Sequence, residues 1–347
     1  MLNTRAGELY NANDVINSND LRKRILNIDS RFRTDLSDPT TNFSFKFTHA
    51  YKNLIRLRIS SIEIPNVFYT FTKWNNSFTI TAYDINCILR EALICIDPGN
   101  YTSAELMCVI QKQMDLKLRD IYGIYMTISV DVHTAKVTIM QEGVTPFGGV
   151  CENPGPIQPG QPFFIEFAAA DKFKKRPTGF GLGYNLGFRK PVYKVHTQTT
   201  CHVPIPMYSV TSEGCLDVVG NSYMFLAVND LHTVEQTTYS TYLQCLAKII
   251  IREDKFSMIY DDGSTLMANE IIFPAPTDLK YLQVQLLDPY GEVVDLNCMD
   301  FSFSIEITEV LNTQLYDFYR NYIWMGGIPS FKRQPNGSGI SLLNGPR

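Results

Sequence analysis

The stretch DPGNYTSAELMCVIQKQM, residues 97–114, decides the fold, because it marks a helix in a chain that otherwise has the pattern of strands. Thr102 and Glu105 have the spacing of a capping box, in which each side chain satisfies a backbone N–H that the first helical turn leaves unpaired. The sequence therefore predicts a helix that starts at Thr102. Apolar residues then recur at spacings of three and four: Leu106, Val109, Ile110 and Met114. We expect this apolar face to pack on a sheet.

Strand patterns precede this helix. Phe43, Phe45 and Phe47 alternate with polar residues, which is the two-residue period of a half-buried strand. Further on, the apolar positions change parity, from Ile55, Leu57 and Ile59 to Ile62 and Ile64. This change predicts a bulge near Ser60-Ser61, and Pro65 is expected to end the strand.

The chain after the helix is again mostly strand in pattern. Alternating residues at 126–132 and 137–139 predict two strands joined by a turn at 133–136. From about residue 190 the pattern is purely β, with candidate strands at 192–197, 222–229, 243–251, 269–273, 280–287 and 301–309. A short helix is expected at 310–323.

Strands on both sides of a unit that contains a helix indicate one β-sandwich with an insertion, because a few N-terminal strands cannot close a core alone. We expect a mainly β fold organised as follows: an N-terminal arm at 1–22, a β-sandwich from 23–85 and 190–312, an inserted α/β unit at 86–189, and a C-terminal helix and extended tail at 313–347. Two consecutive β domains are the alternative. One sandwich requires residues 25–84 to pair with strands beyond 190.

Composition limits the partners of the chain. The net charge of −4, from 31 basic and 35 acidic residues without long blocks, gives no footprint for nucleic acid. The sequence contains no run of about 18 apolar residues, so it predicts no transmembrane segment. We expect a soluble chain made in the cytosol. The eight cysteines are scattered without a C-x-x-C pair, and we interpret them as reduced thiols in the core.

The sequence offers no pattern for catalysis. The five histidines show no H-x-H or H-E-x-x-H spacing, and the run Gly179 to Gly183 lacks the last glycine of a dinucleotide-binding loop, because Tyr184 stands there. We therefore expect no enzyme, no cofactor and no metal site.

The order of seven motifs resembles the minor capsid and penton-type structural proteins of nucleocytoplasmic large DNA viruses, which include the giant viruses. The motifs are ILNIDSRFR at 25–33, RLRISSIEIPNVFY at 56–69, DPGNYTSAEL at 97–106, LGYNLGF at 182–188, AKIII at 247–251, LLDPYGEVVDL at 286–296 and MDFSFSIEI at 299–307. This resemblance implies a jelly-roll β-sandwich and a place in the icosahedral capsid of a virion assembled in the host cytoplasm. Implied partners are copies of the chain itself, the major capsid protein and other minor capsid proteins.

Two sets of residues are candidates for interfaces. In the Gly/Pro/Asn-rich tail at 326–347, Ile340, Leu342 and Leu343 are expected to dock on a partner, and Lys332 and Arg333 are its basic residues before the C-terminal Arg347. Four aromatic residues are candidates for an interface or for a sugar-stacking patch: Tyr239, Tyr242, Tyr290 and Trp324. The sugar-stacking patch belongs to the alternative function, a virion-surface module that binds a host receptor or glycan.

Overall fold

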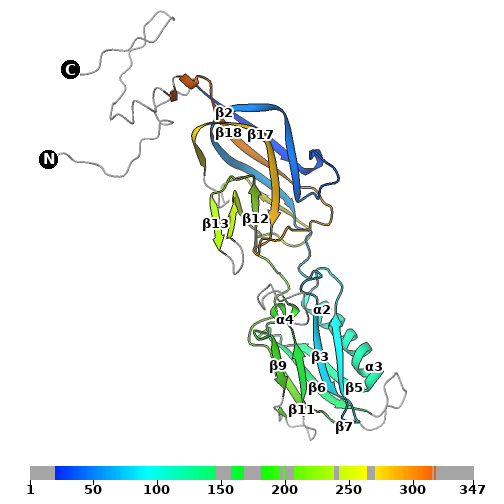
Figure 1. Cartoon of the computed structure of the whole chain (residues 1–347). Helices are drawn as coiled ribbons and strands as arrows, with labels where there is room; N and C mark the ends of the chain where they lie inside the picture. Colours follow the sequence, from blue (N-terminus) through cyan, green and yellow to red (C-terminus); the bar gives the residue numbers. More distant parts are fainter. Residues whose placement is uncertain are drawn as a thin grey trace, which may run out of the picture. The chain divides into compact units, whose positions relative to one another are not determined.

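The computed structural model describes residues 20–145, 158–167, 181–195, 198–199, 207–237, 242–263, 270–314 and 316–317. The chain divides into two compact units (Figure 1). The described parts of 1–66, 223–236 and 242–347 form unit 1, and those of 67–222 and 237–241 form unit 2. Unit 2 is thus inserted into unit 1. It is larger than the 86–189 expected from the sequence, because the strand at Ser77–Tyr83 pairs within unit 2.

Unit 1 contains a seven-stranded antiparallel sheet in the order β1-β18-β2-β17-β12-β15, with β16 paired to β2, and a two-stranded sheet of β13 and β14 (Figure 1). Its elements are β1 (Leu21–Asp29), the 3-10 helix η2 (Ser30–Phe32), β2 (Asn42–Pro65), β12 (Tyr223–Val228), β13 (Val234–Thr237), β14 (Tyr242–Cys245), β15 (Ala247–Ile250), β16 (Met258–Asp261), β17 (Ile271–Leu287) and β18 (Ser302–Val310). The predicted strands at 269–273 and 280–287 are the one strand β17, whose register with β2 shifts around Pro274 and Pro276.

β2 is the centre of this sheet. β18 pairs along one side of it, and β17 and β16 pair along the other, since Glu63 faces both Ser302 and Tyr260. The register against β18 skips one residue of β2 at Ser60, so the predicted bulge is confirmed. β2 also ends at Pro65, as expected.

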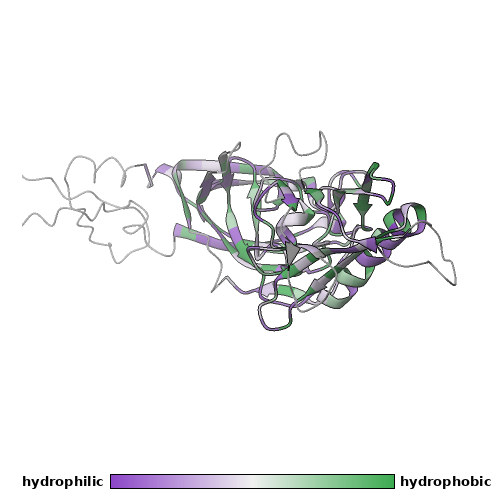
Figure 2. Cartoon of the chain, turned by 90° about the horizontal axis from the view of Figure 1, so that it is seen from below, coloured by the Kyte–Doolittle hydropathy of each residue, from purple (hydrophilic) through white to green (hydrophobic). Residues whose placement is uncertain are grey.

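Pairing between the two ends of the chain decides between the two predicted architectures. β1 pairs antiparallel with β18 from Leu21↔Val310 to Asp29↔Ser302. Strands from before and after the insertion therefore share one sheet, which contradicts two consecutive β domains. The mainly β class is confirmed, and the sheet curls into a half-barrel that agrees with the expected jelly-roll β-sandwich. Hydrophobic and hydrophilic residues alternate along strands of the chain (Figure 2).

Unit 2 contains two antiparallel sheets, one in the order β4-β3-β8-β9 and one in the order β10-β11-β6-β5 with β7 paired to β6. Its elements are β3 (Ser77–Tyr83), β4 (Leu89–Cys95), α2 (Ser103–Met114), the π-helix η3 (Asp115–Arg119), α3 (Asp120–Tyr122), β5 (Ile124–Val130), β6 (Val137–Val144), β7 (Gln158–Pro159), β8 (Phe163–Glu166), α4 (Leu182–Asn185), β9 (Val192–Val195), β10 (Gln198–Thr199) and β11 (Met207–Thr211). The predicted hairpin is confirmed as β5 and β6.

The predicted helix start is confirmed. Thr102 is the N-cap of α2, its side chain accepts a hydrogen bond from the N–H of Glu105, and the Glu105 carboxylate accepts from the N–H of Thr102 at 2.8 Å. The helical segment ends where Gly123 adopts a left-handed φ of 65°.

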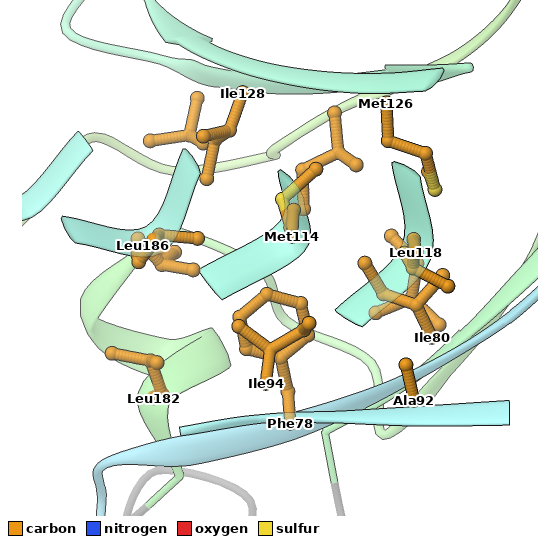
Figure 3. Packing of buried hydrophobic residues seen from close by; sticks show 14 of the residues in the cluster. Phe78, Ile80, Ala92, Ile94, Met114, Leu118, Met126, Ile128, Leu182 and Leu186 are labelled. Carbon is orange, nitrogen blue, oxygen red and sulfur yellow. The ribbon is translucent and has the colours of Figure 1, made fainter. Parts of the chain in front are cut away.

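The apolar face of α2 packs into the core of unit 2. Met114 and Leu118 lie between Phe78 and Ile94 of the first sheet and Met126 of the second (Figure 3). The expected packing of the helix on a sheet is thus observed.

The interpretation of the cysteines as core thiols is wrong for most of those described. Only Cys245 is buried, whereas Cys87, Cys108, Cys215 and Cys298 are exposed. Cys87 and Cys298 lie in turns with φ of 58° and 63°, and such turns run over the surface. Cys151 and Cys201 lie outside the described residues.

The predicted C-terminal helix is described only in part, with Thr313, Gln314, Tyr316 and Asp317 helical. Within the described parts of the chain, no helix has the length and apolar character needed to cross a membrane.

Candidate functional site

β16 presents an exposed apolar surface at an edge of the unit 1 sheet. Met258 and Tyr260 are 54% and 60% exposed, whereas Ile259 between them is 1% exposed. Phe256, just before the strand, is 75% exposed. Within the described residues β16 pairs with β2 alone, so its other edge is open there. Phe256, Met258 and Tyr260 together are termed the β16 apolar edge.

A buried asparagine holds the approach to this strand. The side-chain amide of Asn66 donates to the carbonyl oxygens of Glu253 at 2.8 Å and Asp254 at 3.1 Å. Its backbone N–H donates to the carbonyl of Ser257 at 2.8 Å, and its own carbonyl accepts from the N–H of Phe256 at 2.9 Å. Asn66 is only 1% exposed, so water competes little for these bonds. The loop before β16 is therefore fixed to the end of β2.

Phe256 is held in a conformation that a bulky residue rarely adopts. Its φ is 68°, in the left-handed region where the Cβ of a residue other than glycine meets the following carbonyl. Such a conformation persists only where the surroundings determine it, and here the bonds to Asn66 do so. The ring is nevertheless exposed to solvent and does not pack in the core. This combination of a fixed backbone and a free aromatic ring is typical of a binding surface.

The surroundings of the β16 apolar edge are mainly acidic. Within residues 252–263, the acidic side chains are Glu253, Asp254, Asp261 and Asp262, against the two basic residues Arg252 and Lys255. Burial of the ammonium group lowers the pKa of Lys255 to about 8, so near neutral pH its charge is easier to lose than that of an ordinary lysine. The segment therefore favours a cationic partner.

The face of the sheet next to β16 is polar. Ser302 donates to Glu63, the β2 residue opposite Tyr260, at 2.5 Å. Farther along, Glu306 of β18 accepts from Arg58 at 2.7 Å and lies 3.1 Å from the ammonium of Lys23. The hydrogen bond from Arg58 holds the pKa of Glu306 below its usual value against the opposing effect of burial, with Lys23 contributing in the same direction as Arg58. This part of the sheet is thus held by polar contacts, unlike the β16 edge.

Other polar clusters have structural roles. In unit 2 the Tyr193 hydroxyl donates to Glu213 at 2.6 Å and accepts from the backbone N–H groups of Arg189 and Lys190. Burial raises the pKa of Tyr193, and the bond to Glu213 raises it further. This network ties the segment after α4 to the chain after β11. Among the described residues, no group of His, Cys, Asp and Glu side chains is arranged to hold a metal ion.

Most interface residues predicted from the sequence lie outside the described residues: Tyr239, Trp324, Lys332, Arg333, Ile340, Leu342 and Leu343. The backbone of Tyr242 belongs to β14, but its side chain is not described. Tyr290 is half-buried in the turn after β17, where its N–H donates to Asp288 at 2.8 Å. Both the tail contact and the sugar-stacking patch therefore stay predictions.

Sequence reasoning missed the β16 apolar edge. In the run KFSMIY, residues 255–260, the apolar residues fall on both parities, so the two-residue period of a strand is not visible. The one available signal is the high density of large apolar residues next to the acidic pair Asp261-Asp262.

No protein-family model and no curated protein matches the chain. Among solved structures, the mavirus penton protein is similar over 83% of this chain and 100% of its own length, at 11% identity and a TM-score of 0.38. A chain in the cryo-EM structure of the Sputnik virophage is similar over 84% of this chain and 98% of its own, at 11% identity and a TM-score of 0.39. Since both TM-scores are below 0.5, the proposal below does not rest on these similarities.

Proposed function

We propose that this chain is a non-enzymatic structural protein of a viral capsid, of the minor capsid or penton type, that assembles with copies of itself and with the major capsid protein. The motif order in the sequence suggests the class of protein. The observation that carries the proposal is the β16 apolar edge, where Met258 and Tyr260 stand exposed on a strand with an open side and Phe256 stands exposed just before it.

The physical argument concerns the cost of leaving such an edge uncovered. An exposed, apolar edge strand invites pairing with another chain, and soluble proteins usually blunt it with charge, with proline or with a covering segment. Here the backbone of the loop before β16 is instead fixed by the hydrogen bonds of Asn66. Fixing this backbone before association lowers the entropy lost on binding, which favours a permanent interface.

The titratable groups also support a structural role. Glu306 joins three strands through Arg58 and Lys23, and Asp84 accepts hydrogen bonds from the backbone of Asn86 and Ile88 in a tight turn. Each of these carboxylates is used to hold strands or turns together.

The proposal is tested on virus particles that carry this chain. We expect the chain to be recovered in fixed stoichiometry from shells stripped of their contents, and electron cryo-microscopy should place it in the capsid shell, with a vertex position for the penton type. Absence from purified particles would contradict the proposal, as would turnover of a substrate by the purified chain. Binding to a glycan array without recovery in shells would favour the receptor-binding alternative.

A further inference from the structure

We propose that the β16 apolar edge is the docking site for the C-terminal tail of a second copy of this chain, which adds to β16 as an extended strand. This inference rests on the proposed function, because it names the segment that occupies the proposed assembly surface. The occupant is residues 326–347, with Ile340 and Leu342 as its anchors.

The open side of β16 provides the backbone part of the contact. A strand at the edge of a sheet presents unpaired N–H and C=O groups, and an extended segment can satisfy them by adding one more strand. Tyr260 faces Glu63 and Met258 faces Pro65 on the β2 side, so the opposite side of the strand between Met258 and Tyr260 is where an added strand would pair. The hydrogen bonds from Asn66 keep this edge in place before the partner arrives.

The tail has a pattern that suits this edge. Ile340 and Leu342 alternate with Ser341, so in an extended segment they point to one face, and glycines stand on both sides at Gly339 and Gly345. On an added strand, these two side chains would lie beside Met258 and Tyr260 as cross-strand neighbours. Apolar cross-strand pairs of this kind are the units that stabilise a sheet.

Charge favours the same occupant. The tail carries Lys332, Arg333 and Arg347 and no acidic residue, whereas four acidic residues surround β16. Complementary charge of this kind steers association and sets the orientation of the partner. The tail and the β16 segment are therefore matched in both charge and apolar character.

The tail is long enough to reach another subunit. The 23 residues from Asp317 to Ile340 can extend over roughly 75 Å at about 3.3 Å per residue. A tail bound to its own β16 would cover the surface on which the proposed assembly depends. We therefore assign the docked tail to a second copy.

The test uses full-length protein. Unlabelled chains that carry the photoreactive residue p-benzoylphenylalanine in place of Ser338 are mixed with an equal amount of nitrogen-15-labelled natural chains at a concentration where oligomers form, and light then joins the probe to residues in contact with it. Position 338 lies two residues before Ile340 on the same face of an extended tail, so mass spectrometry should find it joined to residues 256–262 in peptides that combine the two isotopes. Met258→Asp in the labelled chain and Leu342→Asp in the unlabelled chain should each lower the yield of this product at least about tenfold, since each replaces an apolar cross-strand contact with a charge.

Tyr281→Asp is the matched control, because Tyr281 is also exposed, at 59%, but lies on β17 away from β16. It should leave the yield unchanged. Products with a single isotope only, and none that combine the two, would show the tail bound to its own chain and would overturn the inference. Oligomers in which position 338 is not joined to residues 256–262 would overturn the inference and leave the proposed function standing. A chain that stays monomeric and is absent from capsid shells would overturn both.

Discussion

The two strands β1 and β16 both lie at edges of the same sheet, but the side chains near the start of β1 are mostly basic and those exposed on β16 are apolar. β1 is nine residues long and begins with Leu21, Arg22, Lys23 and Arg24, three of them basic. β16 is four residues long and presents Met258 and Tyr260, with Phe256 beside it. Charged residues on an edge strand prevent pairing with another chain, because pairing would remove them from water. β1 is thus a closed edge, and β16 is an open one.

The charges of β1 are also part of the sheet. Lys23 contacts Glu306 of β18, and Arg24 contacts Glu309 at 2.9 Å. The basic residues therefore both block the edge and stabilise the neighbouring strand. On β16 the stabilising contacts come instead from Asn66 and leave the exposed side chains unused. The same sheet therefore carries charged residues on the β1 edge and exposed apolar side chains on the β16 edge. This difference teaches that the apolar exposure at β16 is a specific feature of that strand.

The largest effect on stability is expected at the loop before β16. Asn66→Ala removes two hydrogen bonds to the carbonyl oxygens of Glu253 and Asp254 and keeps the backbone bonds. We expect the free energy of unfolding of unit 1 to fall by about 2 kcal/mol, because two hydrogen bonds worth about 1 kcal/mol each are lost from a buried side chain. Urea unfolding of the full chain measures this. Asn76→Ala, which removes a comparable bond to Ile96 in unit 2, should leave unit 1 unchanged. A loss below about 0.5 kcal/mol in unit 1 would contradict the role of Asn66.

A smaller effect, of opposite sign, is expected at Lys255. Its pKa is about 8 in the folded chain against 10.5 ordinarily, so at pH 7 the folded state bears the cost of a partly buried charge. Lys255→Met should raise the free energy of unfolding at pH 7 by about 1 kcal/mol, less than the full shift implies because solvent reaches the group.

The pH dependence of this difference supplies the check. Between pH 8 and 10.5 the unfolded chain binds more protons at Lys255 than the folded chain, so the stability of the natural chain rises relative to the variant. The difference in the free energy of unfolding between Lys255→Met and the natural chain should therefore shrink over that pH range, as measured by thermal or urea unfolding. A difference independent of pH would show that burial of the charge is not the cause.

On the β1 side, Glu306→Gln should lower the free energy of unfolding by about 0.5 kcal/mol at pH 7, since the partners Lys23 and Arg58 are largely exposed and screened. The pKa of Glu306 is lowered in the folded chain, so its contribution is present above the ordinary value of 4.5 and is lost as the pH falls through the folded pKa. Unfolding curves of the variant and the natural chain should converge in acid. A gap that persists there would contradict the assigned role of the carboxylate.

The smallest effect on stability is expected on the open edge itself. Tyr260→Lys should change the free energy of unfolding by less than about 0.5 kcal/mol, because the side chain is 60% exposed. Ile259→Lys is the contrasting variant, since Ile259 is 1% exposed and its replacement should unfold the edge. If Tyr260→Lys destabilised the chain as strongly, Tyr260 would be part of the core rather than of a surface for a partner.

Features set by local sequence were predictable, and features set by distant contacts were not. The capping box of Thr102 and Glu105 acts within four residues, and the bulge at Ser60 follows from a change of parity in one strand, so both could be predicted. The two strands predicted at 269–273 and 280–287 are one strand, β17, although Pro274 and Pro276 are residues that normally interrupt a strand. The structure keeps them in an irregular stretch, where the register with β2 shifts.

The candidate site illustrates the same limit. The contact between Asn66 and Glu253 joins residues 187 positions apart, and nothing in either local sequence indicates it. The exposure of Phe256 depends on that contact, because the bonds to Asn66 fix the backbone around it. The sequence indicated the mainly β fold and the insertion, but the edge that we propose for assembly emerged only when the ends of β2 and the loop before β16 were seen together.

The most direct test of the account compares the mass of the full-length chain in solution for matched changes at the two edges. Met258→Lys places a charge on the open edge, and Ile25→Lys places the same charge on β1, where Ile25 is 67% exposed. Sedimentation equilibrium over a range of concentrations should show weaker self-association for Met258→Lys, by at least about tenfold in dissociation constant, and no change for Ile25→Lys. Equal association in all three proteins, or loss of association only in Ile25→Lys, would contradict the claim that β16 is the edge through which copies join.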